Sequence, residues 1–465
     1  MFWIPVERSS PKPLIRQVYE HVRAQILCGA LQGGAQLPST RELAVNLHIS
    51  RNVVLEAYDQ LLAEGYLESR AGSGTYVAEG LHFEQEQNRP DVSLALSDAS
   101  FRTENQLIDF RSGLPALDLF PRKQWSQLAQ QVYATAEPAL FGYDNPEGRL
   151  ELRTALARYL QRTRGVFCQP AQILILSGAS QAFSLLNKLL ISPNDAMVIE
   201  DPVHYEVQLI LSSSGAQLVP VPVDEHGMQT DLLPLTKRPR CILVTPSHQF
   251  PQGGILPIQR RLHLLQFARS ADCYVVEDDY DSEFRYVGSP ISSLQGLCPE
   301  RVIYIGSFSK ILSPALRLGY LVLPTELVER ARSIKRLLDL HSPSLEQLIL
   351  AQFIEAGHLE RHIVRMKRVY QKRRNVLITQ LQQHFSDQVE IVGDATGLHL
   401  VARFPQTTFT PETIAALERA GVRVYPVERH AIAKGQHLHD IILGYGHLSP
   451  AQIEQGIGQI KLAIG

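Results

Sequence analysis

Residues 303–320 read Ile-Tyr-Ile-Gly-Ser-Phe-Ser-Lys-Ile-Leu-Ser-Pro-Ala-Leu-Arg-Leu-Gly-Tyr, so that an apolar strand runs into a single lysine, Lys310. We expect strands over Val302–Ile305 and over Tyr320–Leu323, which follows Arg317. A lysine at the end of a buried strand is costly to leave unpaired. Two interpretations stay open. The side chain reaches water from the strand end, or its amine forms a Schiff base with an aldehyde cofactor whose phosphate the nearby hydroxyls and arginine hold.

The composition of the whole chain is typical of a globular protein. Its 465 residues are 45% hydrophobic and 20% charged, with a formal net charge of −2, and this length suits roughly two to four domains. Five scattered cysteines without a CxxC pair favour a reducing compartment over a disulfide framework or a structural zinc site. We find no secretory signal pattern and no apolar run of about 18 residues, so we expect a cytoplasmic protein without a metal or a membrane partner.

The first part of the chain, residues 1–80, is predicted to contain three helices. Apolar residues over Pro13–Leu27 have helical spacing. Ser39 and Ser50 can each cap a further helix, because a serine at that position accepts a hydrogen bond from the first turn. The second and third helices are separated by a short break, which is typical of a helix-turn-helix.

Two parts of this module are predicted to lie at DNA. The exposed start of the third helix is Ser50-Arg51-Asn52. The stretch from Gly65 to Val77 indicates two short strands around Gly72 and Gly74, which would form a wing. Residues 1–80 hold seven Lys/Arg against eight Asp/Glu, so any attraction to DNA depends on where the charges lie and not on the net charge.

The segment from Leu14 to Val77 resembles the winged helix of GntR-type bacterial regulators. The residues that carry the resemblance are Leu37-Pro-Ser-Thr-Arg-Glu-Leu-Ala, Ser50-Arg-Asn and Ala63-Glu-Gly-Tyr-Leu. Arginine and asparagine suit DNA contacts because they donate to phosphates and base edges. A three-helix packing module without DNA binding is the alternative. The resemblance implies DNA contacts by Arg41, Ser50, Arg51, Asn52, Gly72, Gly74 and Thr75.

Residues 81–107 are predicted to form a linker. The stretch contains Pro90 and many Glu, Gln, Asn and Ser, with few large apolar residues. It therefore has little surface to bury. An extended tether and a loop packed along the next domain both stay open.

Residues 108–465 alternate apolar runs with helical segments, which predicts an α/β fold with a mainly parallel sheet. In such folds the sites lie at the carboxyl ends of the strands. We expect strands over Ile173–Leu176, Ala196–Ile199, Leu218–Val223, Cys241–Val244, Tyr274–Val276, Val302–Ile305 and Tyr320–Leu323.

Three polar stretches follow these strands. Ser177-Gly-Ala-Ser-Gln opens a helix and can cradle a phosphate. Glu277-Asp-Asp-Tyr-Asp follows the fifth strand, and Ser307-Phe-Ser-Lys the sixth. A pyridine cofactor with a phosphate needs a cradle, an acid for its ring nitrogen and a lysine for its aldehyde. The chain supplies these three groups in that order.

From about Phe110 onward, the chain resembles fold-type I aminotransferases that use pyridoxal 5′-phosphate. With the winged helix in front, the whole chain resembles the MocR family of bacterial regulators. The residues that carry this are Thr245-Pro-Ser-His-Gln-Phe-Pro, Glu277-Asp-Asp-Tyr-Asp-Ser-Glu-Phe and Ser307-Phe-Ser-Lys. The implied fold is an N-terminal winged helix-turn-helix, residues 1–80, joined by the linker to an aminotransferase-like domain, residues 108–465.

The resemblance also implies a role for each matched residue. Lys310 forms the Schiff base, Asp278 pairs with the pyridinium nitrogen, and Tyr280 donates to the ring hydroxylate. His204 or Tyr205 occupies the position of the aromatic residue that stacks on the ring. His248 and Gln249 replace an asparagine of the enzymes. The phosphate is held by Gly178, Ala179, Ser180, Ser307, Ser309 and Arg317.

Two departures bear on the effector. Glu206 stands where the GABA-responsive member of the family has an arginine, and no arginine directly precedes the strand Ile441–Leu443, where that member has another. Arg423 or Arg429 could substitute from a nearby segment. We therefore expect an effector other than GABA. We also expect that no arginine binds a carboxylate group of this effector in the way that arginines bind aminotransferase substrates.

The resemblance therefore predicts a transcriptional regulator that binds operator DNA and senses a small amine or amino acid through an external aldimine. The resemblance implies a head-to-tail homodimer, in which Tyr143 reaches the site of the partner subunit. Two alternatives stay open: pyridoxal phosphate itself is the signal, or the chain is an aminotransferase with an accessory DNA-binding domain. The basic run Arg361–Arg374 is either a solvated helical face or a ledge for bent DNA.

Overall fold

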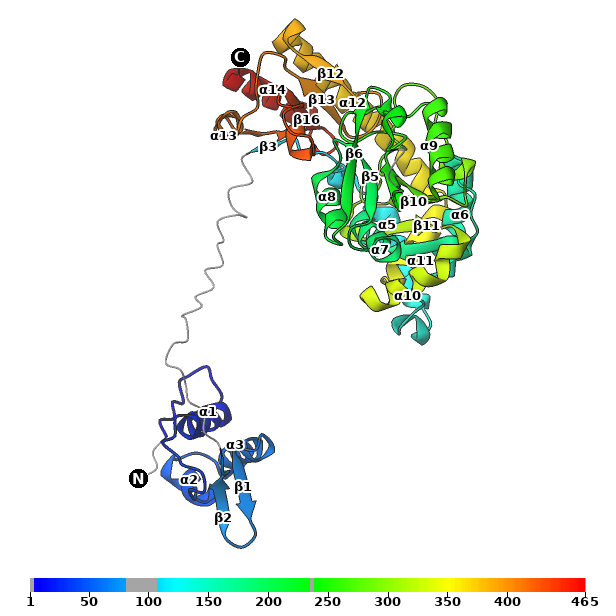
Figure 1. Cartoon of the computed structure of the whole chain (residues 1–465). Helices are drawn as coiled ribbons and strands as arrows, with labels where there is room; N and C mark the ends of the chain where they lie inside the picture. Colours follow the sequence, from blue (N-terminus) through cyan, green and yellow to red (C-terminus); the bar gives the residue numbers. More distant parts are fainter. Residues whose placement is uncertain (1–3, 81–106, 235–237, 465) are drawn as a thin grey trace. The chain divides into compact units, whose positions relative to one another are not determined.

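The computed structural model of the chain describes residues 4–80, 107–234 and 238–464. The chain divides into two compact units, Met1–Ser100 and Phe101–Gly465 (Figure 1). The predicted linker lies outside the described residues except for Leu107, so its boundaries stay a prediction. Of the helices that the structure describes, none is both long enough and apolar enough to cross a bilayer.

The first unit has the predicted winged-helix arrangement. Both predicted serine caps are present: the Ser39 hydroxyl accepts a hydrogen bond from the Glu42 amide, and the Ser50 hydroxyl accepts one from the Val53 amide. The wing is an antiparallel hairpin whose turn contains Gly72 at φ +75°, a conformation that favours glycine. Its elements are α1 (Leu14–Leu27), α2 (Thr40–Asn46), α3 (Arg51–Ala63), β1 (Leu67–Arg70) and β2 (Gly74–Val77).

The second unit is built on a sheet that has eight strands within the described residues, in the order β4-β11-β10-β9-β8-β5-β6-β7. Strands β5, β6, β8, β9 and β10 run parallel, and β11 is antiparallel to both of its neighbours. This confirms the predicted α/β fold. The strands are β4 (Ile173–Leu176), β5 (Ala196–Asp201), β6 (Gln217–Asp224), β7 (Gly227–Met228), β8 (Cys241–Val244), β9 (Tyr274–Asp279), β10 (Val302–Ser307) and β11 (Gly319–Val322).

Helices cover both faces of this sheet (Figure 1). Strand β4 shows why, because Ile173 and Ile175 pack into one apolar cluster while Leu174 and Leu176 pack into another. All four side chains are buried, as expected for a strand inside a two-sided sheet. The helices are α5 (Arg122–Thr135), α6 (Leu150–Arg164), α7 (Ala179–Leu190), α8 (Tyr205–Ser212), α9 (Ile258–Ala271), α10 (Val328–Asp339) and α11 (Ser344–Glu355).

A smaller sheet in the order β12-β13-β16-β15 forms the last part of the unit. One face of it packs against α12 and α14, through buried residues such as Leu377, Leu400 and Ile457. Beside it, β3 pairs in parallel with β14. These elements are α12 (His358–Phe385), α13 (Pro411–Arg419), α14 (Pro450–Ile464), β3 (Ile108–Asp109), β12 (Glu390–Val392), β13 (His399–Arg403), β14 (Val422–Arg423), β15 (Tyr425–Pro426) and β16 (Asp440–Gly444).

Candidate functional site

A cavity of about 290 Å³ lies at the carboxyl ends of the central strands. Nine of the twelve residues predicted to bind the cofactor line it, although they come from five separate segments of the chain. Parallel strands bring such segments together because their carboxyl ends meet at one edge. These nine residues are Ala179, Ser180, His204, Asp278, Tyr280, Ser307, Ser309, Lys310 and Arg317.

Lys310 follows β10 and its amine is enclosed. Burial lowers the pKa of Lys310, and the nearby carboxylates of Asp281 and Asp278 partly oppose that shift. Gly113 lies directly against the amine: a β-carbon on this residue would stand 2.4 Å from the lysine Nζ. Gly113 also has φ +71°, so the space and the backbone both favour glycine here. A lowered amine pKa suits a lysine that must react as a nucleophile.

Asp278 on β9 points a carboxyl group into the cavity. The side chain is half-buried, and no described residue donates a hydrogen bond to it, so its oxygens are open to a ligand in the cavity. Burial raises the pKa of Asp278 to about 7, with a further rise from Asp279 and an opposing effect from Lys310. An unpaired carboxyl group on the cavity wall fits a ligand with a protonated ring nitrogen.

Tyr280 and His248 form a pair in which only the tyrosine lines the cavity. The two rings stack with centroids 5.6 Å apart. Nδ1 of His248 lies 2.8 Å from an Asp281 carboxylate oxygen and 3.0 Å from the Tyr280 hydroxyl. When Nδ1 carries the proton, both oxygens can accept from it, and the hydroxyl proton of Tyr280 is left to donate into the cavity. His248 thus lies behind Tyr280 and orients it.

The residues predicted to hold a phosphate converge where α7 begins. Gly178 precedes the helix at φ +112°, and a β-carbon there would lie 3.5 Å from the Arg317 guanidinium. Arg317 has the left-handed φ of +48°. The first amides of a helix have no intrahelical acceptor, and the hydroxyls of Ser307 and Ser309 lie on the cavity wall beside them. This set of donors matches the oxygens of a phosphate ester.

Of the two ring-stacking candidates, His204 lines the cavity and Tyr205 does not. The Arg429 guanidinium covers the Tyr205 ring at 5.3 Å from its centroid. His204 packs against Phe250, with ring centroids 5.0 Å apart. Gln249, also predicted near the ring, is buried and donates to the carbonyl groups of Pro202 and Phe250.

Several residues of the cavity wall escaped prediction because no local motif marks them. His399 begins β13 of the smaller sheet, and Gly113 follows β3, so only the tertiary fold places them beside Lys310. Phe250 belongs to a motif that carried the resemblance, which was the one signal available. The wall residues missed as site residues are Ser112, Gly113, Phe183, Val207, Ile210, Phe250, Pro314 and His399. Glu206, which the sequence marked as a departure at the position of an arginine, also lies on the wall.

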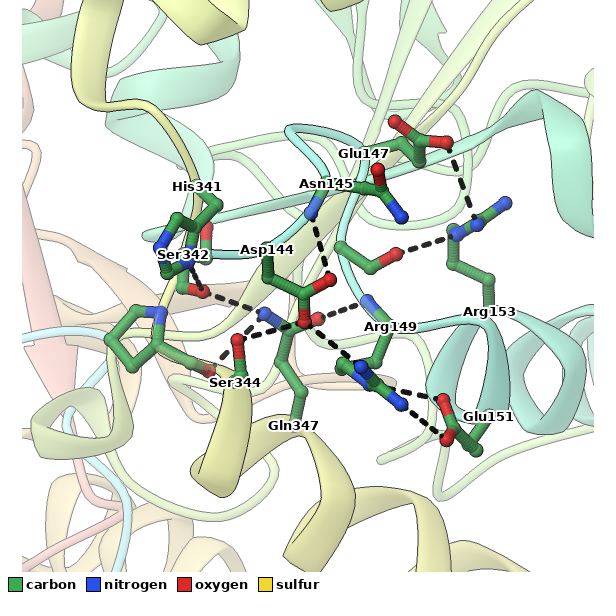
Figure 2. A network of polar contacts seen from close by, with 12 residues as sticks. Asp144, Asn145, Glu147, Arg149, Glu151, Arg153, His341, Ser342, Ser344 and Gln347 are labelled. Atoms are coloured by element: carbon green, nitrogen blue, oxygen red, sulfur yellow. Dashed lines mark hydrogen bonds and ion pairs between the residues drawn. The ribbon is translucent and has the colours of Figure 1, made fainter. Parts of the chain in front are cut away.

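The loop that carries Tyr143 is fixed by a polar network (Figure 2). The Asp144 carboxylate accepts from Arg149 at 3.2 Å and from the Ser344 hydroxyl at 2.9 Å. Gln347 accepts from the Arg149 amide at 2.8 Å. Tyr143 itself is 87% exposed, so its own unit does not bury the ring that the resemblance assigns to a partner.

The residues predicted to contact DNA lie at the starts of α2 and α3 and in the wing hairpin. The Arg51 side chain donates to the Thr40 hydroxyl at 3.4 Å, which joins the first residues of α3 and α2. Their side chains and the wing turn stand at the surface, where a groove of DNA could reach them. Arg41, Ser50, Arg51, Asn52, Gly72 and Gly74 are exposed, and Thr75 is half-buried.

The predicted basic run forms part of α12, and it is not uniformly solvated. Arg373 is buried and donates to the Gly446 carbonyl, while Arg374 pairs with Asp394 at 2.7 Å. At least two of these charges therefore hold α12 to its own unit.

Two family models match the chain. The model described as "Bacterial regulatory proteins, gntR family" matches residues 14–77, and "Aminotransferase class I and II" matches residues 105–436. The first covers the winged helix, and the second contains all the residues of the cavity wall.

Known proteins resemble the chain over nearly its full length. The probable rhizopine catabolism regulatory protein MocR of Rhizobium meliloti is 37% identical over 98% of this chain and 95% of its own length. The pyridoxine biosynthesis transcriptional regulator PdxR of Corynebacterium glutamicum is 30% identical over 99% and 98%. The kynurenine aminotransferase structure from Pyrococcus horikoshii superimposes with a TM-score of 0.72 and 25% identity, covering 77% of this chain and 91% of that one.

Proposed function

Because the chain belongs to the MocR family of pyridoxal-phosphate-dependent transcriptional regulators, we infer that its cavity senses a small amine or amino acid and that the winged helix reports this at operator DNA. The observation that carries the proposal is the convergence at one cavity of an enclosed lysine and an unpaired acid. The same chain exposes an arginine at the start of a recognition helix. An aminotransferase site alone would not need the second feature.

When bound, pyridoxal phosphate supplies an aldehyde carbon that condenses reversibly with primary amines. We assign the holding of its phosphate to Ser307, Ser309, Arg317 and the first amides of α7. Asp278 would keep a proton on the ring nitrogen, and Tyr280 would donate to the ring oxygen. Lys310 would supply the amine that holds the aldehyde until an effector amine arrives.

We propose that the protein acts as a head-to-tail homodimer in the cytoplasm, where bacterial operator DNA is found. The exposed apolar side chains Phe141, Tyr143 and Leu337 support this, with exposures of 60%, 87% and 88%. Large apolar groups on a rigid loop and a helix are typical of a surface that another subunit covers.

Substitutions of one residue in each unit test the proposal. Arg51→Ala should abolish selective binding to genomic fragments that the wild-type protein enriches, while the bound-cofactor absorbance stays unchanged. Lys310→Ala should lose the lysine-bound cofactor spectrum and the response to amines, while DNA binding persists. Arg16→Ala, an exposed arginine on α1, is the control and should bind DNA as the wild type does. Unchanged DNA affinity in Arg51→Ala, or a retained lysine-bound spectrum in Lys310→Ala, would contradict these assignments.

A second candidate is that pyridoxal phosphate itself is the signal. The relative PdxR is named for pyridoxine biosynthesis, and among the described residues of the cavity wall Arg317 is the one arginine, already assigned to the phosphate. If adding the cofactor to cofactor-free protein changes operator affinity while no amine does, this candidate replaces the first. Sustained turnover with a keto acid would instead indicate an aminotransferase.

A further inference from the structure

Glu206 brings a negative charge to the cavity that the cofactor does not use. It lies in the first turn of α8 and on the cavity wall. The other carboxyl, ammonium and guanidinium groups of the described wall belong to Asp278, Lys310 and Arg317. The proposed function assigns these three to the ring, the aldehyde and the phosphate. Glu206 is therefore the charge that remains for an effector, and the inference below rests on the proposed function.

The neighbours of Glu206 neutralise its charge only weakly. One carboxylate oxygen lies 2.8 Å from Nδ1 of His204, and the other lies 3.9 Å from the Arg429 guanidinium, at the outer limit of an ion pair. Arg429 covers the Tyr205 ring, and neither of these two residues lines the cavity. An effector inside the cavity thus meets the carboxylate and not the guanidinium.

The histidines of the same wall do not supply a compensating positive charge. Burial lowers the pKa of His204 and of His399, and the nearby charge of Lys310 lowers both further, although Glu206 opposes the shift at His204. Both rings are consequently neutral near pH 7, so they can form hydrogen bonds but cannot balance an effector carboxylate. An anionic group beside Glu206 would be repelled.

The remaining wall of this region is apolar. Val207 and Ile210 lie on the same helix as Glu206, and Phe250 packs against His204. Aliphatic and aromatic side chains suit a hydrocarbon stem, which would gain free energy by leaving water. An ammonium group, a stem and a second amine would match Glu206, the apolar wall and the Lys310 end of the cavity in turn.

We propose that the effector is a diamine, with one amino group at the Lys310 end of the cavity and a second, protonated one bound by Glu206. A hydrogen bond between an ammonium group and a carboxylate is stronger than one between neutral groups. The Glu206 side chain is 58% exposed, so water weakens this bond, and loss of its charge should weaken effector affinity about tenfold.

The test compares three amines of equal carbon number: a monoamine, an α,ω-diamine and an ω-amino acid, each with stems of three to six carbons. Full-length protein loaded with pyridoxal phosphate is titrated with each probe, and two quantities are followed, the cofactor absorbance and the affinity for DNA. The variants are Glu206→Gln and Glu206→Arg. Glu225→Gln, which makes the same change at an exposed carboxylate outside the cavity wall, is the matched control.

The wild type and Glu225→Gln should respond to a diamine at about tenfold lower concentration than to the monoamine. Glu206→Gln should lose this preference, and Glu206→Arg should prefer the ω-amino acid. Equal responses to monoamine and diamine, or a wild-type preference for the ω-amino acid that Arg429→Ala removes, would overturn the diamine assignment and leave the amine-sensing function standing. If no amine of any kind alters absorbance or DNA affinity, the proposed function fails together with it.

Discussion

The carboxyl group of Asp278 differs from those of Glu200 and Glu277 because it accepts no hydrogen bond from the described residues. Glu200 accepts from Thr245, and Glu277 accepts from the amides of Leu294 and Gln295 at 3.0 Å each. These two acids are satisfied by the protein itself, whereas Asp278 depends on a ligand for a partner. That difference distinguishes a binding residue from two structural acids of the same sheet.

The substitution Asp278→Asn tests this dependence. An amide cannot hold a proton on a pyridine nitrogen as a carboxylate does, so affinity for pyridoxal phosphate should fall by about tenfold to a hundredfold. Because no hydrogen bond within the described residues is lost, thermal stability of the cofactor-free protein should not fall. An absorbance titration measures the first quantity and calorimetry the second. Asp231→Asn, at an exposed carboxylate, should leave both unchanged; equal cofactor affinity in the two variants would contradict the assignment.

Individual site residues were predictable from the sequence where several functional side chains lie close together in one short motif. Lys310, Asp278 and Ser307 all follow or end apolar runs, so their place at strand ends could be inferred, and they do line one cavity. His399 could not be inferred, because its neighbours in the sequence carry no related group. Tyr205 illustrates the opposite case: helix direction turns it away from the cavity while the adjacent His204 lines it.

At the scale of elements, the parallel strands concentrate acids in the interior. Burial raises the pKa of Glu200 on β5 and of Glu277 on β9 to about 7 each, with Asp279 adding to the shift of Glu277. In the unfolded chain such side chains titrate near pH 4.5. At these two acids the folded state therefore binds more protons between these values, and the stability that they contribute is lost as the pH rises from about 4.5 through 7.

Urea unfolding of the cofactor-free protein at pH 6.5 and pH 8 measures this effect. The free energy of unfolding of the second unit should be lower at pH 8. Glu200→Gln, which imitates the protonated acid and keeps an acceptor for Thr245, should reduce the difference between the two pH values. Glu225→Gln should keep the wild-type difference. An equal difference between the two pH values in the wild type and in Glu200→Gln would show that Glu200 is already ionised in the folded protein at pH 6.5.

The elements themselves were largely predictable. Each of the seven expected strands is present, because a fully buried strand needs an uninterrupted apolar run. The errors lie at the ends: β9 extends to Asp279 and β10 to Ser307. Polar residues continue these strands because backbone pairing with a neighbour, such as Ile305 opposite Asp278, persists beyond the apolar core.

At the scale of the whole molecule, two separate cores imply two units that can unfold independently. The core of the first is built from residues between Ile4 and Val77, and the clusters of the second draw only on residues from Ile108 onward. Periodicity and motif order predicted this division. The contacts between the small sheet and the cavity were not predictable, since they depend on tertiary packing and not on local pattern.

Scanning calorimetry of the full chain should consequently show two heat-absorption peaks. Pyridoxal phosphate binds one folded unit, so a concentration of one hundred times Kd should stabilise that unit by about 2.7 kcal/mol and leave the other unchanged. Lys310→Ala should reduce this shift. A single peak that moves as a whole with the cofactor would show that the units unfold together.

The position of Gly113 against the Lys310 amine has one more consequence. Gly113 follows β3, and β3 begins at Ile108, the second described residue after the segment that leads back to the winged helix. The shortest connection from the Lys310 amine to the segment that leads to the DNA-reading unit therefore crosses the non-bonded contact with Gly113 and then follows one short strand. Most of the second unit takes no part in this short connection between the amine and the segment that leads to the winged helix.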